Sequence, residues 1–212
     1  MAFKNLFRAL PVLIMTMIAA PAAAGPHSIV GFGDSLMAGY QLGPGESFAD
    51  RLQHALREKG HDVAVANAGV SGDTSSDGLA RLDWSVPDGT DLVILELGAN
   101  DMLRGIDPAI TEQNLDRMIA RLAERGIPVL LAGMRAAPNL GADYQEAFDG
   151  IFPRLAEKYR IELYPFMLDG VAGQREMQLA DGMHPNAKGV DRMVEGALPF
   201  VLRALSKLAG QQ

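Results

Sequence analysis

The 212-residue sequence contains no cysteine. This absence excludes a cysteine nucleophile, thiolate metal ligands and a scaffold held by disulfides. Stability must therefore come from an ordinary hydrophobic core, which a chain of this length can bury within a single domain.

Positive charge is scarce relative to negative charge. The chain has 19 Lys and Arg residues against 26 Asp and Glu residues, a net charge of −7. Lys4 and Arg8 are the only charged residues among the first 24, so the remainder carries −9. Such a surface repels phosphate backbones and anionic lipids, so we expect it to bind neither nucleic acid nor an anionic membrane surface.

Long apolar runs are absent apart from one near the start of the chain. Residues 9–20 are almost wholly apolar, follow Lys4 and Arg8, and precede the small residues Pro21-Ala22-Ala23-Ala24-Gly25. A spanning helix needs roughly 20 apolar residues, so the pattern favours a signal peptide over an uncleaved anchor. We predict a signal peptide over 1–24, a mature domain over 25–212, no stable membrane insertion after cleavage, and a periplasmic or secreted location.

Short apolar runs alternate with helical patterns along the rest of the chain. Alternation of this kind predicts a parallel sheet covered by helices on both faces, an α/β fold of three layers. The predicted strands are residues 28–32, 63–66, 91–97, 127–132 and 161–163. The predicted helices cover 47–59, the stretch from Asp107-Pro108 to Gly126, 144–159 with a kink at Pro153, and 186–208.

Polar and glycine-rich segments stand where three of these strands end. They are Gly33-Asp34-Ser35, residues 67–74 and Gly98-Ala99-Asn100-Asp101; a fourth, Asp181-Gly182-Met183-His184-Pro185-Asn186, precedes the last helix. Because sites in parallel sheets form at the carboxyl ends of the strands, we expect these loops to meet at one edge.

Ser35, His184 and Asp181 are candidates for nucleophilic catalysis. A serine hydroxyl needs an adjacent base, and Asp181, three residues before His184, could orient the imidazole. The residues alone leave alternatives open. Ser35 could simply cap a helix, and the Asp181–His184 pair could be half of a metal site or part of a helix cap.

An acyl-transfer site also needs donors for an oxyanion, and two residues qualify. Gly72 can present its backbone N–H, and Asn100 its side-chain amide, although a turn glycine and an Asx turn are the plain alternatives. A groove lined by apolar loop residues would favour acyl chains, although such residues equally often form satellite packing. The loop residues considered for this groove are Met37, Leu103, Ile106, Leu140 and Met183.

The four segments, in this order and spacing, resemble the blocks of the SGNH (GDSL-type) hydrolase superfamily. Gly33-Asp34-Ser35-Leu36 resembles the nucleophile block, Gly72 and Asn100 match the second and third blocks, and Asp181 to His184 match the fourth. Residues 33–40, 67–82, 96–105, 144–155 and 181–186 further resemble the bacterial periplasmic multifunctional thioesterase I, protease I, lysophospholipase and arylesterase branch.

The resemblance implies a flavodoxin-like three-layer α/β/α fold with a central parallel sheet of about five strands. It implies Ser35, Asp181 and His184 as the catalytic triad, Ser35 N–H, Gly72 N–H and Asn100 as the oxyanion hole, and neither a cofactor nor a metal. The expected substrates are small esters, thioesters or lysophospholipids, hydrolysed by a monomer. We expect substrate contacts from Asp34, Leu36, Leu103, Pro138 and Met183.

One stretch departs from that branch. Arg135 is followed by Ala136-Ala137-Pro138, where the branch usually carries a bulkier Leu-Pro pair. The loop of residues 134–141, to which this stretch belongs, is expected to border the acyl site, so smaller side chains there could widen the site and alter the preferred chain length. The alternative functions are a carbohydrate O-acetyl esterase and a non-catalytic lipid- or sugar-binding module on the same fold.

Overall fold

A computed structural model of the chain describes residues 25–209. The predicted signal peptide, residues 1–24, lies outside the described residues. Within residues 25–209, none of the helices combines the length and apolar character needed to cross a membrane.

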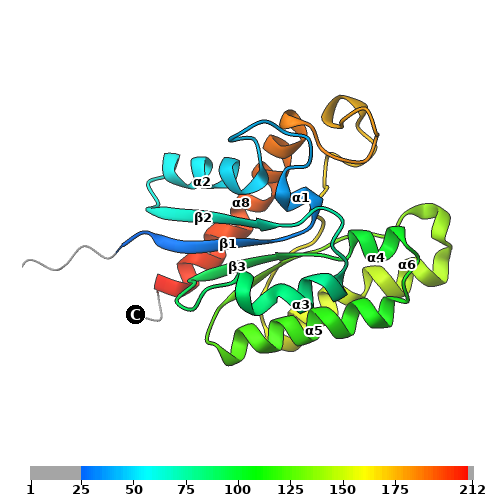
Figure 1. Cartoon of the computed structure of the whole chain (residues 1–212), viewed down its shortest axis with the longest axis horizontal. Helices are drawn as coiled ribbons and strands as arrows, with labels where there is room; N and C mark the ends of the chain where they lie inside the picture. Colours follow the sequence, from blue (N-terminus) through cyan, green and yellow to red (C-terminus); the bar gives the residue numbers. More distant parts are fainter. Residues whose placement is uncertain (1–24, 210–212) are drawn as a thin grey trace, which may run out of the picture.

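Five parallel strands form one sheet in the order β2-β1-β3-β4-β5 (Figure 1). Their bounds are β1 His27–Gly33, β2 Val63–Gly69, β3 Leu92–Glu96, β4 Val129–Ala132 and β5 Glu162–Tyr164. The central strand β3 is buried at every position, as its almost wholly apolar sequence predicts for a strand covered on both faces. The predicted parallel sheet is confirmed.

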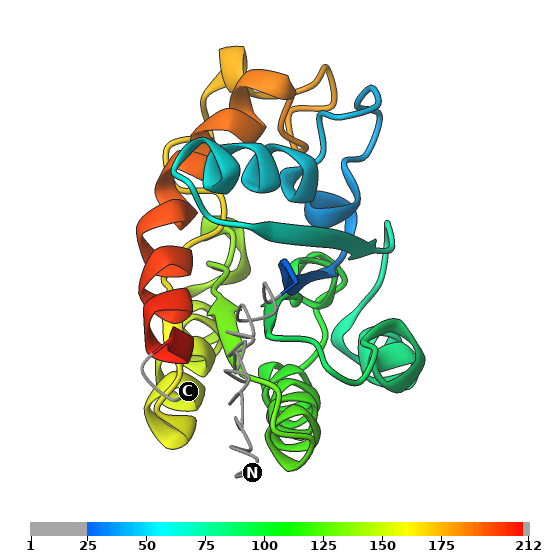
Figure 2. The same cartoon turned by 90° about the vertical axis from the view of Figure 1, so that its left-hand side faces the viewer.

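Helices cover both faces of this sheet, as Figure 2 shows with the molecule turned by 90°. One face carries α2 (Phe48–Glu58) and α8 (Ala187–Ala209), which pack against each other. The other carries α3 (Ser75–Ser85), α5 (Pro108–Glu124) and α7 (Ile151–Tyr159). The shorter helices are α1 (Ser35–Ala38), α4 (Ala99–Leu103) and α6 (Ala142–Asp149), with 3-10 turns at Pro138–Leu140 and Arg175–Met177. The three-layer prediction is therefore confirmed.

The predicted helix over 144–159 is two helices, α6 and α7, that meet at Gly150. The kink was predicted at Pro153, but the interruption lies about one turn earlier, at Gly150. Proline has no N–H and its ring crowds the carbonyl four residues earlier, here that of Asp149. The interruption therefore falls beside Asp149, while Pro153 itself sits in the first turn of α7, where proline is tolerated.

Helix α3 has no counterpart among the predicted elements. Its buried face consists of Ser75, Gly78, Arg81 and Leu82, so an apolar period is missing. A capping box begins it instead: the Thr74 side chain accepts from Asp77 N–H and the Asp77 side chain accepts from Thr74 N–H. Gly78 lies close against Leu97, whose side chain would have to shift to admit a Cβ at this position.

Candidate active site

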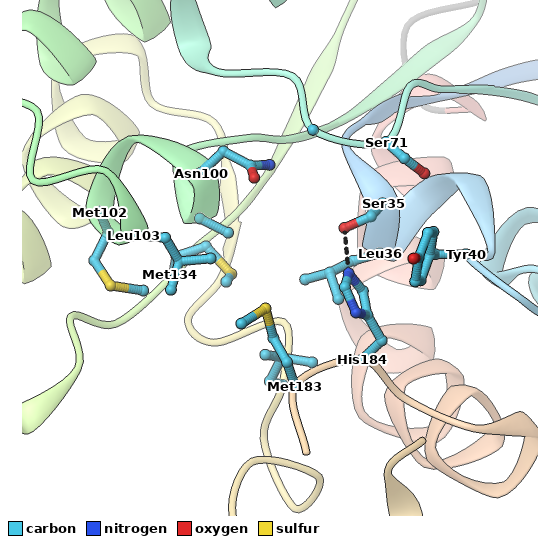
Figure 3. Close-up of a pocket in the computed structure, with 13 residues that line it drawn as sticks. Ser35, Leu36, Tyr40, Ser71, Asn100, Met102, Leu103, Met134, Met183 and His184 are labelled. Carbon is cyan, nitrogen blue, oxygen red and sulfur yellow. Dashed lines mark hydrogen bonds between the residues drawn. The ribbon is translucent and has the colours of Figure 1, made fainter. Parts of the chain in front are cut away.

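The four predicted loops meet at one edge of the sheet. Ser35 follows β1, Gly72 follows β2, Asn100 follows β3, and His184 lies in the loop before α8; all four line a common cleft (Figure 3). The rule that sites form at the carboxyl ends of parallel strands thus places these residues correctly.

Ser35 is the first residue of α1 and does not cap it. The cap is Asp34, whose Oδ1 accepts the Leu36 N–H at 3.0 Å. The alternative interpretation of Ser35 as a helix cap is therefore wrong, and its hydroxyl is free to face the cleft. The preceding Gly33 has no space for a Cβ, which would run into the side chain and carbonyl of Glu96 on the neighbouring strand.

His184 links Ser35 to Asp181 although 149 residues separate it from Ser35. Its Nε2 lies 2.9 Å from Ser35 Oγ and its Nδ1 lies 2.7 Å from Asp181 Oδ2 (Figure 3 draws the first bond). An imidazole held in this way has one nitrogen oriented by a carboxylate and the other facing a hydroxyl.

The turn around Asp181 stabilises its charge. Asp181 Oδ1 accepts the N–H groups of Met183 and His184, at 2.9 and 3.0 Å, and Gly182 adopts a positive φ of 68° that lets the turn close. Three hydrogen bonds lower the pKa of Asp181 to about 2. The bond from the Met183 N–H has the largest effect, and those from the His184 imidazole and the His184 N–H have smaller ones.

The two alternative roles of this loop find no support in the geometry. Helix α8 is capped by Asn186, whose Oδ1 accepts the Gly189 N–H at 3.1 Å, so Asp181 is not its cap. Among residues 25–209, no group of three His, Asp or Glu side chains is placed to hold a metal ion.

Tyr40 contacts the imidazole on its other side and was not predicted. The two ring centroids are 4.4 Å apart and the rings are tilted by 38°. Tyr40 belongs to the stretch that follows the nucleophile block, but only the fold brings it beside His184. The ring restricts the orientation of the imidazole while leaving Nε2 facing Ser35.

Three possible oxyanion donors surround Ser35. Its own N–H and that of Gly72 have no acceptor within the described part of the chain. Gly72 requires glycine because its φ is 90°, and its carbonyl accepts from Arg104 at 2.7 Å. The third donor, Asn100 Nδ2, is already bonded to Asp34 Oδ2 at 3.0 Å and to the Asp73 carbonyl at 2.9 Å.

Two buried carboxyl groups lie beneath the nucleophile. Asp34 and Glu96 are both fully buried, and Glu96 Oε2 accepts the Asp34 N–H at 3.2 Å. Burial raises the pKa of Asp34 to about 6, and burial together with the nearby Asp34 raises the pKa of Glu96 well above its usual range. The two carboxyl groups therefore retain their protons to higher pH than exposed carboxyl groups do.

Arg81 fixes the loops beside Ser35. This buried side chain of α3 donates to the Gly33 and Ala68 carbonyls, each at 2.8 Å, and to Asp73 Oδ2 at 2.6 Å. It thus joins the carboxyl ends of β1 and β2 to the residue next to Gly72. Nothing in the apolar pattern of the sequence marks this arginine, because its partners are mainly backbone carbonyls.

The cleft has a volume of about 360 Å³ and an apolar lining. Leu36, Leu103 and Met183 line it, as predicted. Met102, Met134 and Leu168 complete the apolar wall. Met102 and Leu168 were not predicted, whereas Met134 follows β4 and belongs to the loop of residues 134–141 that was expected to border the acyl site.

Other residues considered for substrate contact lie away from the cleft. Asp34 faces α1 and Asn100 instead of the cleft, and Met37 is fully buried under the sheet edge. Pro138, Ile106 and Leu140 do not line the cleft. Ala136 is buried and its N–H donates to Asp149, so Met134, and not the Ala136-Ala137-Pro138 stretch, borders the cleft. The loop of residues 134–141 thus borders the cleft through Met134, and an effect of its small side chains on the preferred chain length stays a prediction.

Residues 32–192 match the GDSL-like Lipase/Acylhydrolase family. The chain belongs to this family. It is 38% identical over 203 residues to an arylesterase of Vibrio mimicus, covering 95% of this chain and 99% of the relative. It is 37% identical over 209 residues to the thioesterase 1/protease 1/lysophospholipase L1 of Escherichia coli K12, covering 98% and 95%. The crystal structure of AlinE4, an SGNH-hydrolase family esterase, is 48% identical, covers 87% of this chain and 99% of its own, and superposes with a TM-score of 0.73.

These relationships confirm the resemblance to the thioesterase, lysophospholipase and arylesterase branch. Family membership makes the chain a carboxylic ester hydrolase, as predicted, and rules against a non-catalytic binding module.

Proposed function

We propose that this acylhydrolase works through an acyl-enzyme on Ser35, with His184 as general base and Asp181 as the group that orients it. The observation that carries the proposal is the hydrogen-bonded chain from Asp181 through His184 to Ser35, which opens on the apolar cleft. The 2.9 Å between His184 Nε2 and Ser35 Oγ is within the reach that proton transfer requires. The 2.7 Å between His184 Nδ1 and Asp181 Oδ2 is that of a hydrogen bond that orients the imidazole.

The reaction has two steps. His184 Nε2 takes the Ser35 proton as Oγ attacks the substrate carbonyl, and Asp181 stabilises the imidazolium that forms. Donors at Ser35 N–H, Gly72 N–H and Asn100 Nδ2 stabilise the oxyanion, and His184 then protonates the leaving alcohol or thiol. Water repeats the sequence on the acyl-enzyme and releases the acid.

We propose acyl esters, acyl thioesters and lysophospholipids as substrates. The support is the apolar wall of Leu36, Met102, Leu103, Met134, Leu168 and Met183, together with the arylesterase and thioesterase/lysophospholipase activities in the names of the relatives. A carbohydrate O-acetyl esterase would need polar groups for the sugar, which this wall does not offer. Hydrolysis rates for acetylated sugars, aryl esters, acyl thioesters and lysophospholipids would distinguish the two functions, and a preference for the sugars would contradict the acyl-chain assignment.

We further propose that residues 1–24 direct export and are removed, and that the mature enzyme acts outside the cytoplasm as a monomer. The basic and apolar segments of the first 24 residues support export. Mass spectrometry of the protein secreted by an expressing bacterium should find an N-terminus at Gly25.

The mechanism is tested by replacing Ser35. Ser35→Ala should lower kcat on a nitrophenyl ester by several orders of magnitude, as loss of the nucleophile does in other triads. Ser206→Ala is the matched control, because Ser206 is an exposed serine of α8 that donates only to the Arg203 carbonyl. Near-wild-type activity in Ser35→Ala would contradict the proposal.

A further inference from the structure

The Asn100 amide already uses both of its hydrogens inside the protein. A primary amide nitrogen carries two N–H donors. One points at Asp34 Oδ2, at a nitrogen–oxygen distance of 3.0 Å, and the other at the Asp73 carbonyl, at 2.9 Å. Before Asn100 can donate to an oxyanion, one of these two bonds must therefore be given up or shared.

The two acceptors are not equivalent. Asp34 is ionised above pH 6, since burial raises its pKa only to about 6, and a bond to a carboxylate is roughly twice as strong as one to a neutral carbonyl. The groups that face Asp34 are Glu96 of β3, Asp73 of the loop after β2, and His184. Burial and the nearby Asp34 both raise the pKa of Glu96, which favours the neutral form of that carboxyl.

Asp34 is itself rigidly held. It is fully buried, its Oδ1 accepts the Leu36 N–H and its own N–H donates to Glu96 Oε2. The second acceptor is the carbonyl of Asp73, in the segment between β2 and α3 that also carries Gly72. A pivot of the Asn100 amide about its bond to Asp34 would turn the second hydrogen from this carbonyl toward the cleft.

We propose that Asp34 is a positioning residue for the oxyanion hole: it retains one hydrogen of the Asn100 amide while the oxyanion displaces the Asp73 carbonyl from the other. This inference rests on the proposed function, since it assigns a role within the same site. It gives Asp34, which touches neither the cleft nor the reacting atoms, an effect on kcat that runs entirely through Asn100.

Asp34→Asn tests the inference because it keeps the shape and the acceptor for Leu36 N–H. The new side-chain NH₂ group would face the NH₂ group of Asn100, so two donors would meet. The Asn100 amide should then rotate by 180°, which places its oxygen where its nitrogen now lies, beside the cleft. A double-mutant cycle with Asn100→Ala then separates a positioning role from a structural one. Thermal denaturation of each variant, compared with wild type, establishes that the measured protein is folded.

Removal of one oxyanion donor costs about 10²–10³ in kcat, so both single variants should lose activity on this scale with little change in KM. The double variant should be no slower than Asn100→Ala alone. A double-variant loss equal to the product of the two single losses would overturn the inference, as would an Asp34→Asn variant with wild-type kcat. Neither result touches the Ser35 mechanism, which fails only if Ser35→Ala remains active.

Wild-type protein offers a second measurement should Asp34→Asn not fold. The two side-chain amide protons of Asn100 can be followed by NMR before and after a phosphonate inhibitor is attached to Ser35. One proton should move, because it exchanges the Asp73 carbonyl for the phosphonyl oxygen, and the other should keep its position. Movement of both protons, or of neither, would overturn the inference.

Discussion

Replacing Arg81 with methionine should destabilise the fold and loosen the loops on either side of Ser35. The guanidinium is only 8% exposed and its ion-pair partner Asp73 only 12%. It also lies 4.1 Å from the centroid of the Phe32 ring. Methionine preserves much of the apolar volume of the side chain but none of its donors.

The loss of unfolding free energy expected for Arg81→Met follows from the polar groups that would lose their donor. Without the guanidinium, the Asp73 carboxylate and the carbonyls of Gly33 and Ala68 are left without this donor in a largely buried environment. Removing one partner of a buried ion pair costs about 3–5 kcal/mol. Arg81→Lys should cost less, because it keeps the charge but cannot reach all three acceptors.

Urea denaturation gives the free energy of unfolding directly. Arg121→Met is the matched control, because Arg121 of α5 pairs with Asp83, which lies in the same helix as Arg81, but its side chain is 47% exposed. An exposed ion pair of this kind contributes about 0–1 kcal/mol. If Arg81→Met cost no more than this control, Arg81 would not be the anchor of these loops. The kcat of Arg81→Met should also fall under conditions in which the variant remains folded, because Asp73, the residue next to Gly72, has lost its ion pair with Arg81.

Three further predictions concern other parts of the molecule. Gly196→Ala would press a Cβ against the buried Tyr164 hydroxyl, which has no hydrogen-bond partner among residues 25–209. The variant should lose about 1–3 kcal/mol of unfolding free energy in urea denaturation, and adding Tyr164→Phe should restore most of it. Because the pKa of Asp181 is lowered, its ionised form stabilises the folded state above about pH 4, and this contribution disappears as the pH falls toward 2. Thermal denaturation from pH 2 to 5 should therefore show a smaller fall in Tm with decreasing pH for Asp181→Asn than for wild type. Tyr40→Ala should lower kcat/KM about 2- to 12-fold through the lost ring contact with His184, whereas Tyr40→Phe, which keeps the ring, should not.

Elements with a strong apolar period were predictable from the sequence. Strand β3 is apolar from Leu92 to Leu95, and α5 begins at Asp107-Pro108 and ends before Gly126 as its pattern indicates. Helix α3 was not predictable in this way, because Gly78 and Arg81 occupy its buried face. Its formation depends on the Thr74 capping box and on tertiary contacts that local patterns do not report.

The same distinction applies to the site. Strand ends and a base next to an acid pointed to Ser35, His184 and Asp181, because those signals are local. The contact of Tyr40 with His184 depends on how separate loops pack. Asp34 was expected to face substrate, whereas its buried carboxylate turns back to Leu36 and Asn100, a choice that only the surrounding hydrogen bonds determine.

The measurement that tests the Ser35 mechanism most directly is covalent labelling with a fluorophosphonate, followed by peptide mass spectrometry. Wild-type enzyme should carry one adduct on Ser35 and lose its esterase activity in step with labelling, and Ser35→Ala should carry none. An adduct on another residue that accompanies the loss of activity, or full esterase activity in the labelled enzyme, would contradict the mechanism.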